Sequence, residues 1–517
     1  MHFSIIAHIP ADNGSGKEFI TLLDSIAHQI ELSFSLILLG EADAKTMEYL
    51  DKSGLDYQLL PAKDPYSIVL NEAFGKAGEY IMYIDNRSGH IILKKASLIT
   101  FRIAAERNPD AAFFYADYEL VDGENIREVK LLTHHIGRVR DNQDYGKVFF
   151  IRKQNWEKTG GFDPKIEYNH WYDMRLKLSC AGKLVCIGNK YSGSLYSVFA
   201  ANKTANVFDY LLAGKQIQLE AEQILTAHLK RLGAWLKPGE FFEGKKQVRP
   251  VGELEASIII PVGHRPEFIS TAIESIQEQT VKNIEAIIVV NGGANDPTAD
   301  EVRKYMKGGA LYDPEKPDIR LLVIDINNIG LCLNLGAGIA RGKYYVQLDS
   351  DDRLKPDAVE KILHVFSSDP SIGMVIGSYE VWEKKEDGKL VRMEEIPVVT
   401  HDEWTEENGR NNLLRINGAG APRSIPITLI KEMGYFSVND DAFARNYGED
   451  YELVNKIAEK YRIGRVYDPI YEVVRHAGGT DHAINQDLVD RNDNAKDDMR
   501  KEAIHRRIAF NQSNGER

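Results

Sequence analysis

Four residues in the second half of the chain have side chains suited to binding a metal ion. Asp349, Ser350, Asp351 and Asp352 directly follow the run 344–348, whose Tyr, Val and Leu residues are typical of a buried strand. Carboxylates this close repel one another unless a cation compensates their charge. Their oxygens suit Mg²⁺ or Mn²⁺ held jointly with substrate phosphates. The plain alternative is an acidic turn whose Asp residues cap a helix.

The elements around this cluster predict where it lies in the fold. After Asp352 the chain reads as a loop that turns into a helix at Pro356. The acids therefore stand at the carboxyl end of a buried strand. In open α/β sheets this is the edge at which ligands bind.

Composition and charge narrow the class of protein. The 517 residues are 43% hydrophobic and 27% charged, which is typical of a globular protein with two or three domains. The net charge of -13 argues against nucleic-acid binding. No apolar run approaches the roughly 20 residues that cross a bilayer, and from the first residues we expect no signal peptide. We expect a protein that is cytoplasmic or peripheral to the inner membrane face, and whose cysteines (Cys180, Cys186 and Cys332) are buried thiols.

The first half opens with a strand, a helix and a strand, over 3–9, 18–29 and 34–39, and further strands follow at 80–84 and 111–115. The second half repeats this order. Leu333 and Asn334 precede Gly342 as Leu70 and Asn71 precede Gly78, with a period of about 250 residues, far too long for a solenoid repeat.

We therefore predict an α/β protein with two tandem, mainly parallel, Rossmann-like domains joined by a helix and a linker. The predicted boundaries are 1–237 for the first domain, 238–255 for the linker and 256–484 for the second domain. The charged segment 485–517 is a helix or a tail. A long helical pattern covers 207–235.

The second half, from residue 257 to about 480, resembles the family 2 glycosyltransferases, which have the GT-A fold. The resemblance covers four motifs in order. They are the opening strand Ser257 to Val262, the paired Asn-Ile-Gly and Asn-Leu-Gly at 328–330 and 334–336, the acidic cluster 349–352 in the place of the D-x-D motif, and Gly-Glu-Asp at 448–450.

This resemblance implies a set of site residues. A nucleotide-sugar donor would be bound by Pro261, Val262, Asn291, Asn334, Asp349, Ser350 and Arg475. Mn²⁺ or Mg²⁺ would be held by Asp351, by Asp349 directly or through water, and by His476, and Asp352 would be structural. A generic surface role for His476 stays open.

The resemblance also implies the reaction. A cation neutralises the diphosphate leaving group, and a general base on the opposite face takes the proton of the acceptor hydroxyl. The resemblance assigns that base to Asp450, with Glu449 beside it, and implies inversion at the sugar. The alternative is that both acids only favour the start of a helix.

Two departures from the family pattern bear on the donor. Asn291 stands where many members have an acid that recognises the base, and Cys332-Leu333-Asn334 stands where Ala-Arg-Asn is frequent. UDP is the expected nucleotide, with GDP and dTDP left open. The expected acceptor is a hydroxyl of a glycan or another molecule, as in polysaccharide biosynthesis.

The first copy lacks the catalytic residue types. Asp85 aligns with Asp349, Arg87 aligns with Asp351, and His170-Trp171 aligns roughly with Glu449-Asp450. A guanidinium cannot coordinate a metal ion. We expect a non-catalytic first domain that serves as a scaffold or positions the acceptor. For the whole chain, a sugar nucleotidyltransferase and a non-catalytic nucleotide- or sugar-binding protein are the alternatives.

Overall fold

The computed structural model describes residues 3–10, 16–30, 33–87, 89–189, 192–199, 214–239, 250–385, 387–400, 409–418, 420–440, 447–476 and 486–515. The chain forms two compact units, Met1–Leu232 and Gly233–Arg517, called unit 1 and unit 2 below. Each unit is described by itself. Both are mixed α/β structures with mainly parallel central sheets, which confirms the predicted fold class.

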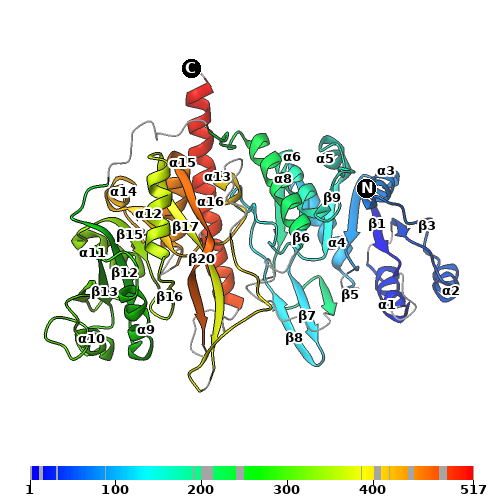
Figure 1. Ribbon diagram of the computed structural model, residues 1–517. Helices are drawn as coiled ribbons and strands as arrows, with labels where there is room; N and C mark the ends of the chain where they lie inside the picture. Colours follow the sequence, from blue (N-terminus) through cyan, green and yellow to red (C-terminus); the bar gives the residue numbers. More distant parts are fainter. Residues whose placement is uncertain are drawn as a thin grey trace. The chain divides into compact units, whose positions relative to one another are not determined.

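Unit 1 alternates strands and helices along most of its length (Figure 1). Its strands are β1 (Phe3–His8), β2 (Phe34–Leu39), β3 (Tyr57–Leu60), β4 (Tyr80–Ile84), β5 (His90–Leu93), β6 (Ala111–Ala116), β7 (Tyr118–Asp122), β8 (Asn125–Val129), β9 (Val148–Arg152), β10 (Lys183–Ile187) and β11 (Tyr196–Phe199). Its helices are α1 (Gly16–Ala27), α2 (Ala44–Ser53), α3 (Tyr66–Lys76), α4 (Ser97–Arg107), α5 (Lys153–Lys158), α6 (His170–Ala181) and α8 (Lys215–Leu232).

The main sheet of unit 1 has the strand order β10-β6-β9-β4-β1-β2-β3. Within it, β9 runs antiparallel to β4 and β6, and the other neighbours are parallel. A second, smaller sheet has the order β5-β11-β7-β8. The strands predicted at 34–39 and 80–84 have the predicted bounds. The long helical pattern is α8 over its described part; it ends at Leu232 because Gly233 takes a positive φ of 73°.

Unit 2 has the same alternation (Figure 1). Its strands are β12 (Leu254–Val262), β13 (Ile284–Val290), β14 (Asp318–Val323), β15 (Gly342–Gln347), β16 (Arg353–Leu354), β17 (Ile372–Lys384), β18 (Leu390–Arg392), β19 (Arg423–Pro426) and β20 (Arg462–Arg475). Its helices are α9 (Pro266–Gln277), α10 (Pro297–Arg303), α11 (Ile329–Ile339), α12 (Ala358–Ser368), α13 (Gly409–Asn412), α14 (Ile427–Glu432), α15 (Glu449–Lys460) and α16 (Gln486–Gly515).

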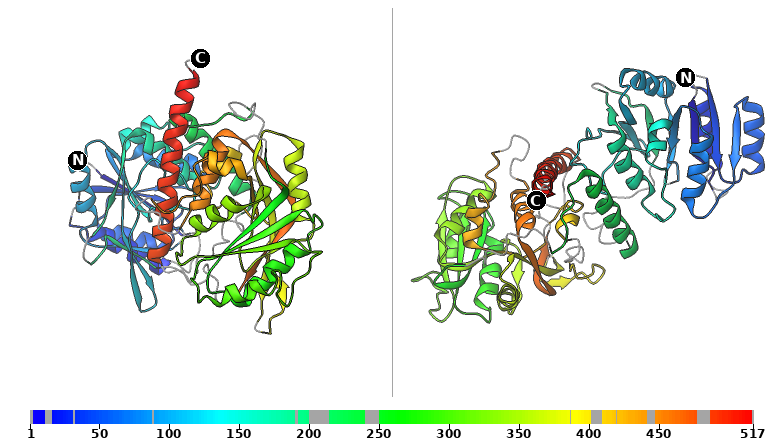
Figure 2. Two further views of the ribbon diagram at one scale, coloured as in Figure 1. Left: turned by 90° about the vertical axis from the view of Figure 1, so that its left-hand side faces the viewer. Right: turned by 90° about the horizontal axis from the view of Figure 1, so that it is seen from above.

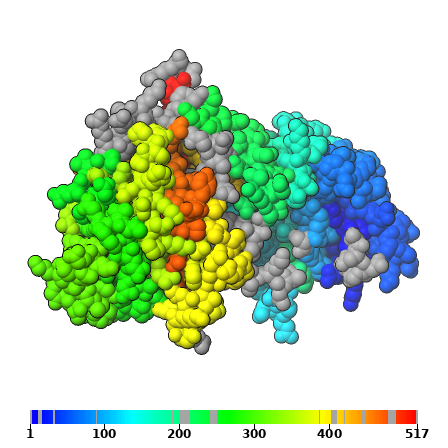
Figure 3. Space-filling model, in the orientation of Figure 1, coloured from blue at the N-terminus to red at the C-terminus, as the bar shows by residue number. Residues whose placement is uncertain are grey.

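The sheet of unit 2 has the order β14-β13-β12-β15-β19-β17-β20-β16, and β18 pairs with β17. β19 is antiparallel to β15 and β17, whereas β17 and β20 are parallel and lie side by side across the face shown in Figure 3. Figure 2 shows α16 as one continuous helix. Within the described residues, no helix has the length and apolar character needed to span a membrane.

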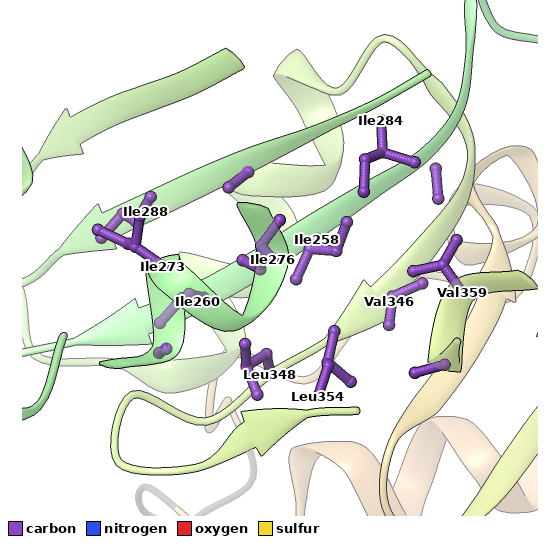
Figure 4. Packing of buried hydrophobic residues seen from close by; sticks show 14 of the residues in the cluster. Ile258, Ile260, Ile273, Ile276, Ile284, Ile288, Val346, Leu348, Leu354 and Val359 are labelled. Atoms are coloured by element: carbon purple, nitrogen blue, oxygen red, sulfur yellow. The ribbon is translucent and has the colours of Figure 1, made fainter. Parts of the chain in front are cut away.

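The core of unit 2 covers both faces of the central strands. Ile258 and Ile260 of β12 pack with Ile273 and Ile276 of α9 on one face (Figure 4), and Ile259 packs in a separate cluster on the other face. A strand buried on both faces reads as a continuous apolar run. This burial explains why the residues of β12 form a continuous apolar run in the sequence. A central strand of this kind ends where polar residues begin, and the acidic cluster lies at such a strand end.

The two units share one strand order. Across the sheet of unit 1 the strands follow the order β3-β2-β1-β4-β9-β6-β10, and across that of unit 2 the order β14-β13-β12-β15-β19-β17-β20. Neighbouring strands are parallel or antiparallel at the same places in the two orders. A buried serine recurs at the same place. Ser4 Oγ accepts the Gly78 N–H at 2.8 Å, and Ser257 Oγ accepts the Gly342 N–H at 2.9 Å.

A second hydrogen-bond pattern also recurs. The Asn71 amide donates to the Phe162 carbonyl at 2.9 Å and accepts the Phe162 N–H at 2.8 Å. The Asn334 amide donates to the Phe436 carbonyl at 2.8 Å and accepts the Phe436 N–H at 3.0 Å. Each asparagine thus connects a helix, α3 or α11, to a loop that approaches the start of α6 or α15.

Candidate active site

The acidic cluster lies where the sequence predicts it, directly after β15. The Asp349 N–H donates to the Tyr471 hydroxyl at 3.1 Å, and the Gln347 side-chain amide donates to Asp349 Oδ1 at 3.3 Å. Burial raises the pKa of Asp349 and the nearby Asp351 raises it further, although Arg423 opposes both. The carboxyl end of β15 is therefore a place where positive charge is favoured.

Asp352 and Ser350 occupy positions with a structural role. Asp352 Oδ1 accepts the Val474 N–H at 2.8 Å, which ties the end of the cluster to β20. Burial raises the pKa of Asp352 well above its usual value. Ser350 is also buried. Asp349 and Asp351 are thus the members of the cluster that are placed to meet a ligand.

Asp351 makes contacts with two side chains that are remote in the sequence. Its Oδ2 lies 2.7 Å from Arg265 Nη1 and 3.0 Å from His476 Nε2. The His476 ring packs against Phe268, with centroids 4.1 Å apart. Arg265 follows the end of β12 and His476 follows the end of β20, so three strand ends meet at this carboxylate.

The chemistry of these groups fits a divalent cation that shares its coordination with substrate phosphates. A carboxylate oxygen and an imidazole nitrogen that already lie 3.0 Å apart are ligands that Mn²⁺ accepts. Over the parts of the chain that the structure describes, no three His, Cys, Asp or Glu side chains form a metal-binding group. Mg²⁺ and Mn²⁺ bound with phosphates usually take only one or two ligands from protein carboxylates.

Glu449 and Asp450 begin α15, after Gly448 with a φ of 86°. A side chain at Gly448 would be strained, and the end of the Met499 side chain of α16, whose Cε lies 2.9 Å from the position of a Cβ atom, would have to shift. The positive φ therefore favours glycine at this turn. This turn brings the first residues of α15 close to the end of β15.

Arg423, the first residue of β19, connects the two acidic motifs. Its Nη1 lies 3.1 Å from Asp450 Oδ2, and its Nε donates to the Gln347 side-chain oxygen at 3.3 Å. Gln347 in turn donates to Asp349. One guanidinium, on a side chain that is 14% exposed, thereby links acids that are about 100 positions apart in the sequence.

The two acids of α15 have opposite electrostatics. Burial and the neighbouring Asp450 raise the pKa of Glu449 from 4.5 to about 7. Burial also acts to raise the pKa of Asp450, but Arg423 and Lys496 outweigh it and the pKa falls below 3.8. The Asp450 side chain is 23% exposed and Glu449 is 8% exposed, so Asp450 is the more accessible carboxylate.

The C-terminal helix α16 contributes to this site. Lys496 is buried, donates to the Asn417 carbonyl, and lies 4.7 Å from the centroid of the Tyr447 ring. Burial lowers the pKa of Lys496 to about 8, although Asp450 acts to raise it. The charged terminal segment is thus packed into unit 2.

Arg500 anchors the same helix. Its guanidinium donates to the carbonyls of Leu414 and Ile416 at 2.8 and 2.7 Å and pairs with Asp497 at 2.7 Å, all within the interior. It also donates to Asn417 Oδ1 at 2.7 Å. α16 therefore holds the segment that precedes β19 and, through it, the position of Arg423.

The other expected donor-binding residues lie at the strand ends. Pro261 and Val262 are paired with β13, and the Val262 carbonyl accepts the Asn291 N–H at 2.8 Å. The Asn291 side chain is buried and donates to Asn327 Oδ1 at 3.2 Å. Arg475 ends β20. The Asn334 amide is engaged on the Phe436 backbone at both ends, so its position in the structure is that of a loop anchor.

Sequence reasoning missed three cations of this site, namely Arg265, Arg423 and Lys496. Arg265 stands in the loop after β12. Arg423 begins a short strand, and Lys496 lies in a strongly charged helix. No local sequence pattern identifies a cation whose acidic partner lies 27 to 86 residues away in the chain. The Gly-Gly-Thr at 478–480 and His482 lie outside the described residues.

Comparison with known proteins places part of unit 2 in a family. Residues 257–418 match the family model "Glycosyl transferase family 2", a span that includes Asp349 and Asp351 and ends before Glu449 and Asp450. An uncharacterized glycosyltransferase of Haemophilus influenzae is 35% identical over 136 residues, which are 26% of this chain and 39% of that protein. The chondroitin synthase of Pasteurella multocida is 34% identical over 119 residues, 23% of this chain and 12% of that protein.

The solved structures that match this chain share little of its sequence. Residues 1–349 of S. aureus TarS in complex with UDP-GlcNAc give a TM-score of 0.35 at 16% identity, covering 51% of this chain and 75% of that one. The mannosyltransferase PcManGT of Pyrobaculum calidifontis, in complex with GDP-Man and Mn²⁺, gives 0.32 at 16% identity, covering 51% and 66%. This chain spans well under half of the length of the two sequence relatives described above. On the family match, the chain carries a glycosyl transferase family 2 domain at residues 257–418.

Proposed function

We propose that unit 2 transfers a sugar from a nucleotide-diphosphate sugar to a hydroxyl of a glycan or another acceptor, with inversion at the anomeric carbon. Asp349 and Asp351 lie on the donor side, and Asp450 acts as the general base. The observation that carries this function is the link from Asp349 through Gln347 and Arg423 to Asp450. It brings the two acidic motifs of the family pattern together in one partly exposed site.

Asp450 is the better placed of the two acids to accept the acceptor's proton. It is ionised at neutral pH because Arg423 and Lys496 lower its pKa against the effect of burial. It is also the more exposed of the two. A general base must be within hydrogen-bond reach of the proton that it takes. Glu449, with a pKa near 7, would orient the acceptor as a hydrogen-bond partner.

Asp351 and His476 would hold a divalent cation, Mn²⁺ or Mg²⁺, together with donor phosphates. When bound, that ion supplies positive charge at the diphosphate leaving group. Arg265 already supplies a cation to Asp351, and it can contact the diphosphate once a metal ion takes over the carboxylate. UDP is the proposed nucleotide. The name chondroitin synthase of one relative supports a glycan acceptor.

We also propose that unit 1 is a second, non-catalytic copy of the same fold. The shared strand order and the recurring Ser4 and Asn71 hydrogen bonds support this. In β4, Ile81 lies opposite Ser4 as Tyr345 lies opposite Ser257, so Arg87 takes the place of Asp351.

Aromatic rings take the place of the polar link in unit 1. Tyr83, Phe149 and Trp171 stand at the positions of Gln347, Arg423 and Asp450 by the same register and by their place in α6. The Trp171 ring lies 4.4 Å from Tyr83 and 4.8 Å from Phe149. An indole cannot accept a proton as a carboxylate does, so unit 1 would not catalyse transfer.

Thermal unfolding with UDP, GDP, CDP and dTDP, each with and without Mn²⁺, tests the donor side, because a ligand that binds only the folded state raises its stability. We expect one nucleotide to stabilise the wild type only with Mn²⁺, and Asp351→Ala to abolish this effect. The control Asp300→Asn, whose side chain is 77% exposed, should keep it. A panel without any effect, or an effect independent of Mn²⁺ and Asp351, would favour the non-catalytic binding protein instead.

Sugar transfer tests the acceptor side. With the sugar nucleotide chosen from that panel and a set of oligosaccharide acceptors, Asp450→Asn should still bind the nucleotide but lose transfer by on the order of 10²- to 10⁴-fold. If Asp450→Asn retains transfer while Glu449→Gln loses it, the assignment of the base moves to Glu449.

A further inference from the structure

Unit 1 contains a cleft of about 980 Å³ over the carboxyl ends of β1, β2, β3 and β4. Residues that follow these strands line it, among them Pro10, Gly40, Ala62 and Arg87, together with Gly16 at the start of α1. This edge of an open α/β sheet is where ligands bind. A volume of this size lies at the upper end of the range of about 300–1,000 Å³ for small-molecule sites.

Arg87 gives the cleft a fixed positive charge. Its Nε donates to Asp85 Oδ1 at 2.9 Å, and its guanidinium carbon lies 4.6 Å from the centroid of the Tyr66 ring. Among the described residues Asp85 is its one ion-pair partner, and that pair uses Nε, so both terminal nitrogens are left for a ligand. The side chain is 41% exposed. A guanidinium held in this way matches the oxygens of a phosphate.

The floor of the cleft is rigid before any ligand arrives. The Asn86 amide donates to the His8 carbonyl at 2.8 Å and accepts the His8 N–H at 2.9 Å. His8 Nε2 lies 2.7 Å from the Tyr66 hydroxyl and 2.8 Å from the Tyr83 hydroxyl. Burial and Arg87 lower the pKa of His8 to about 4, so this ring is neutral near pH 7. A preorganised floor reduces the entropy lost on binding.

The rim of the cleft favours a ligand that carries hydroxyl groups. Its lining includes the acids Glu18, Glu41, Asp43 and Asp64 beside Lys63. Carboxylates accept hydrogen bonds from sugar hydroxyls but repel a bare polyanion. One cation on the floor and acids at the rim therefore suit a phosphate joined to a sugar.

We propose that this cleft binds a nucleoside diphosphate or a sugar phosphate without a divalent metal ion, and that Arg87 contacts the phosphate. The aromatic cluster of Tyr83, Phe149 and Trp171 makes this a site of binding without transfer. The binding depends on contacts within unit 1 alone, so it is independent of the activity proposed for unit 2.

The experiment is calorimetric titration of the full chain in EDTA with UDP, GDP, glucose 1-phosphate and pyrophosphate. We expect a hydroxyl-bearing probe to bind the wild type and Asp351→Ala alike, and pyrophosphate to bind more weakly. Arg87→Met should weaken binding at least about tenfold, since a charge-assisted hydrogen bond is lost. Arg127→Met, on the exposed strand β8, should bind as the wild type does. Comparing the nucleotides with glucose 1-phosphate identifies which kind of phosphate the cleft takes.

Hydrogen exchange on the wild type covers the case in which Arg87→Met does not fold. A probe in the cleft should slow exchange in peptides from α1 and from residues 85–87, and should leave residues 349–354 unchanged. The proposal is overturned if no probe binds in EDTA, if Arg87→Met binds as tightly as the wild type, or if protection falls on 349–354 and requires Mn²⁺. The last result would still support the activity of unit 2. Pyrophosphate binding as tight as UDP would overturn the assignment of a sugar-bearing ligand.

Discussion

Replacing Glu449 with Gln should stabilise the protein in a strongly pH-dependent way. Burial and Asp450 raise the pKa of Glu449 from 4.5 to about 7, so the folded protein holds this proton over a pH range in which the unfolded chain has lost it. Stability therefore falls as the pH rises from 4.5 to 7, because the folded state binds more protons than the unfolded state. Gln imitates the protonated form and removes this dependence.

The size of the effect follows from the pKa difference. A difference of about 2.5 pKa units, at 1.36 kcal/mol each, corresponds to about 3 kcal/mol. Glu449→Gln should leave the stability unchanged at pH 4.5 and below, and should increase it by about 3 kcal/mol at pH 8. An increase of this size on removing a charge is typical of a residue kept for function at a cost in stability.

Asp450→Asn should change the stability in the opposite direction and destabilise the protein. The pKa of Asp450 is lowered, so its contribution is present above the unfolded pKa and is lost as the pH falls through the folded pKa. At pH 7 the substitution leaves the largely buried Arg423 without its carboxylate partner, 3.1 Å away. Breaking one side of such a buried pair costs about 3–5 kcal/mol.

The assay is pulsed hydrogen exchange in increasing urea at pH 5, 6, 7 and 8, read by mass spectrometry on peptides of α15. Peptides of unit 1 provide an internal control, since a chain with two units need not unfold in one step. A change of stability in the same direction in both variants, or an equal gain in Glu449→Gln at pH 5 and pH 8, would contradict the opposite pKa shifts of the two acids.

Three further substitutions test the cations of unit 2. Arg265→Met removes the cation that pairs with Asp351, so Mn²⁺ should bind on the order of tenfold more tightly, as measured by paramagnetic resonance titration. An unchanged affinity would show that Arg265 and Mn²⁺ do not compete for Asp351. Lys496→Met raises the pKa of the proposed base, so the acid limb of the pH–rate profile should move up by about one unit; an unmoved limb would contradict this. Arg500→Met strands a buried acid and should cost about 3–5 kcal/mol in urea unfolding, whereas the exposed Arg506→Met should cost less than about 1 kcal/mol.

Local patterns in the sequence were enough to predict the strands and the position of the acids. β2 and β4 have the predicted bounds, and Asp349 to Asp352 follow a buried strand as expected, because a strand covered on both faces must be apolar and must end where polar residues begin. The choice between a helix and a tail at 485–517 could not be made in this way. α16 is mostly polar, and it is held both by a few buried apolar residues, such as Met499 and Ile504, and by buried charges such as Arg500.

Only the tertiary structure decided which charges meet. Arg423 and Asp450 come from different elements, and so do Arg265 and Asp351. An isolated charged residue has the same sequence signal whether it is solvated or paired, because the stabilising partner is set by how the sheet and helices close. The same holds for Asn334, whose sequence context suggested the donor and whose amide holds the Phe436 loop.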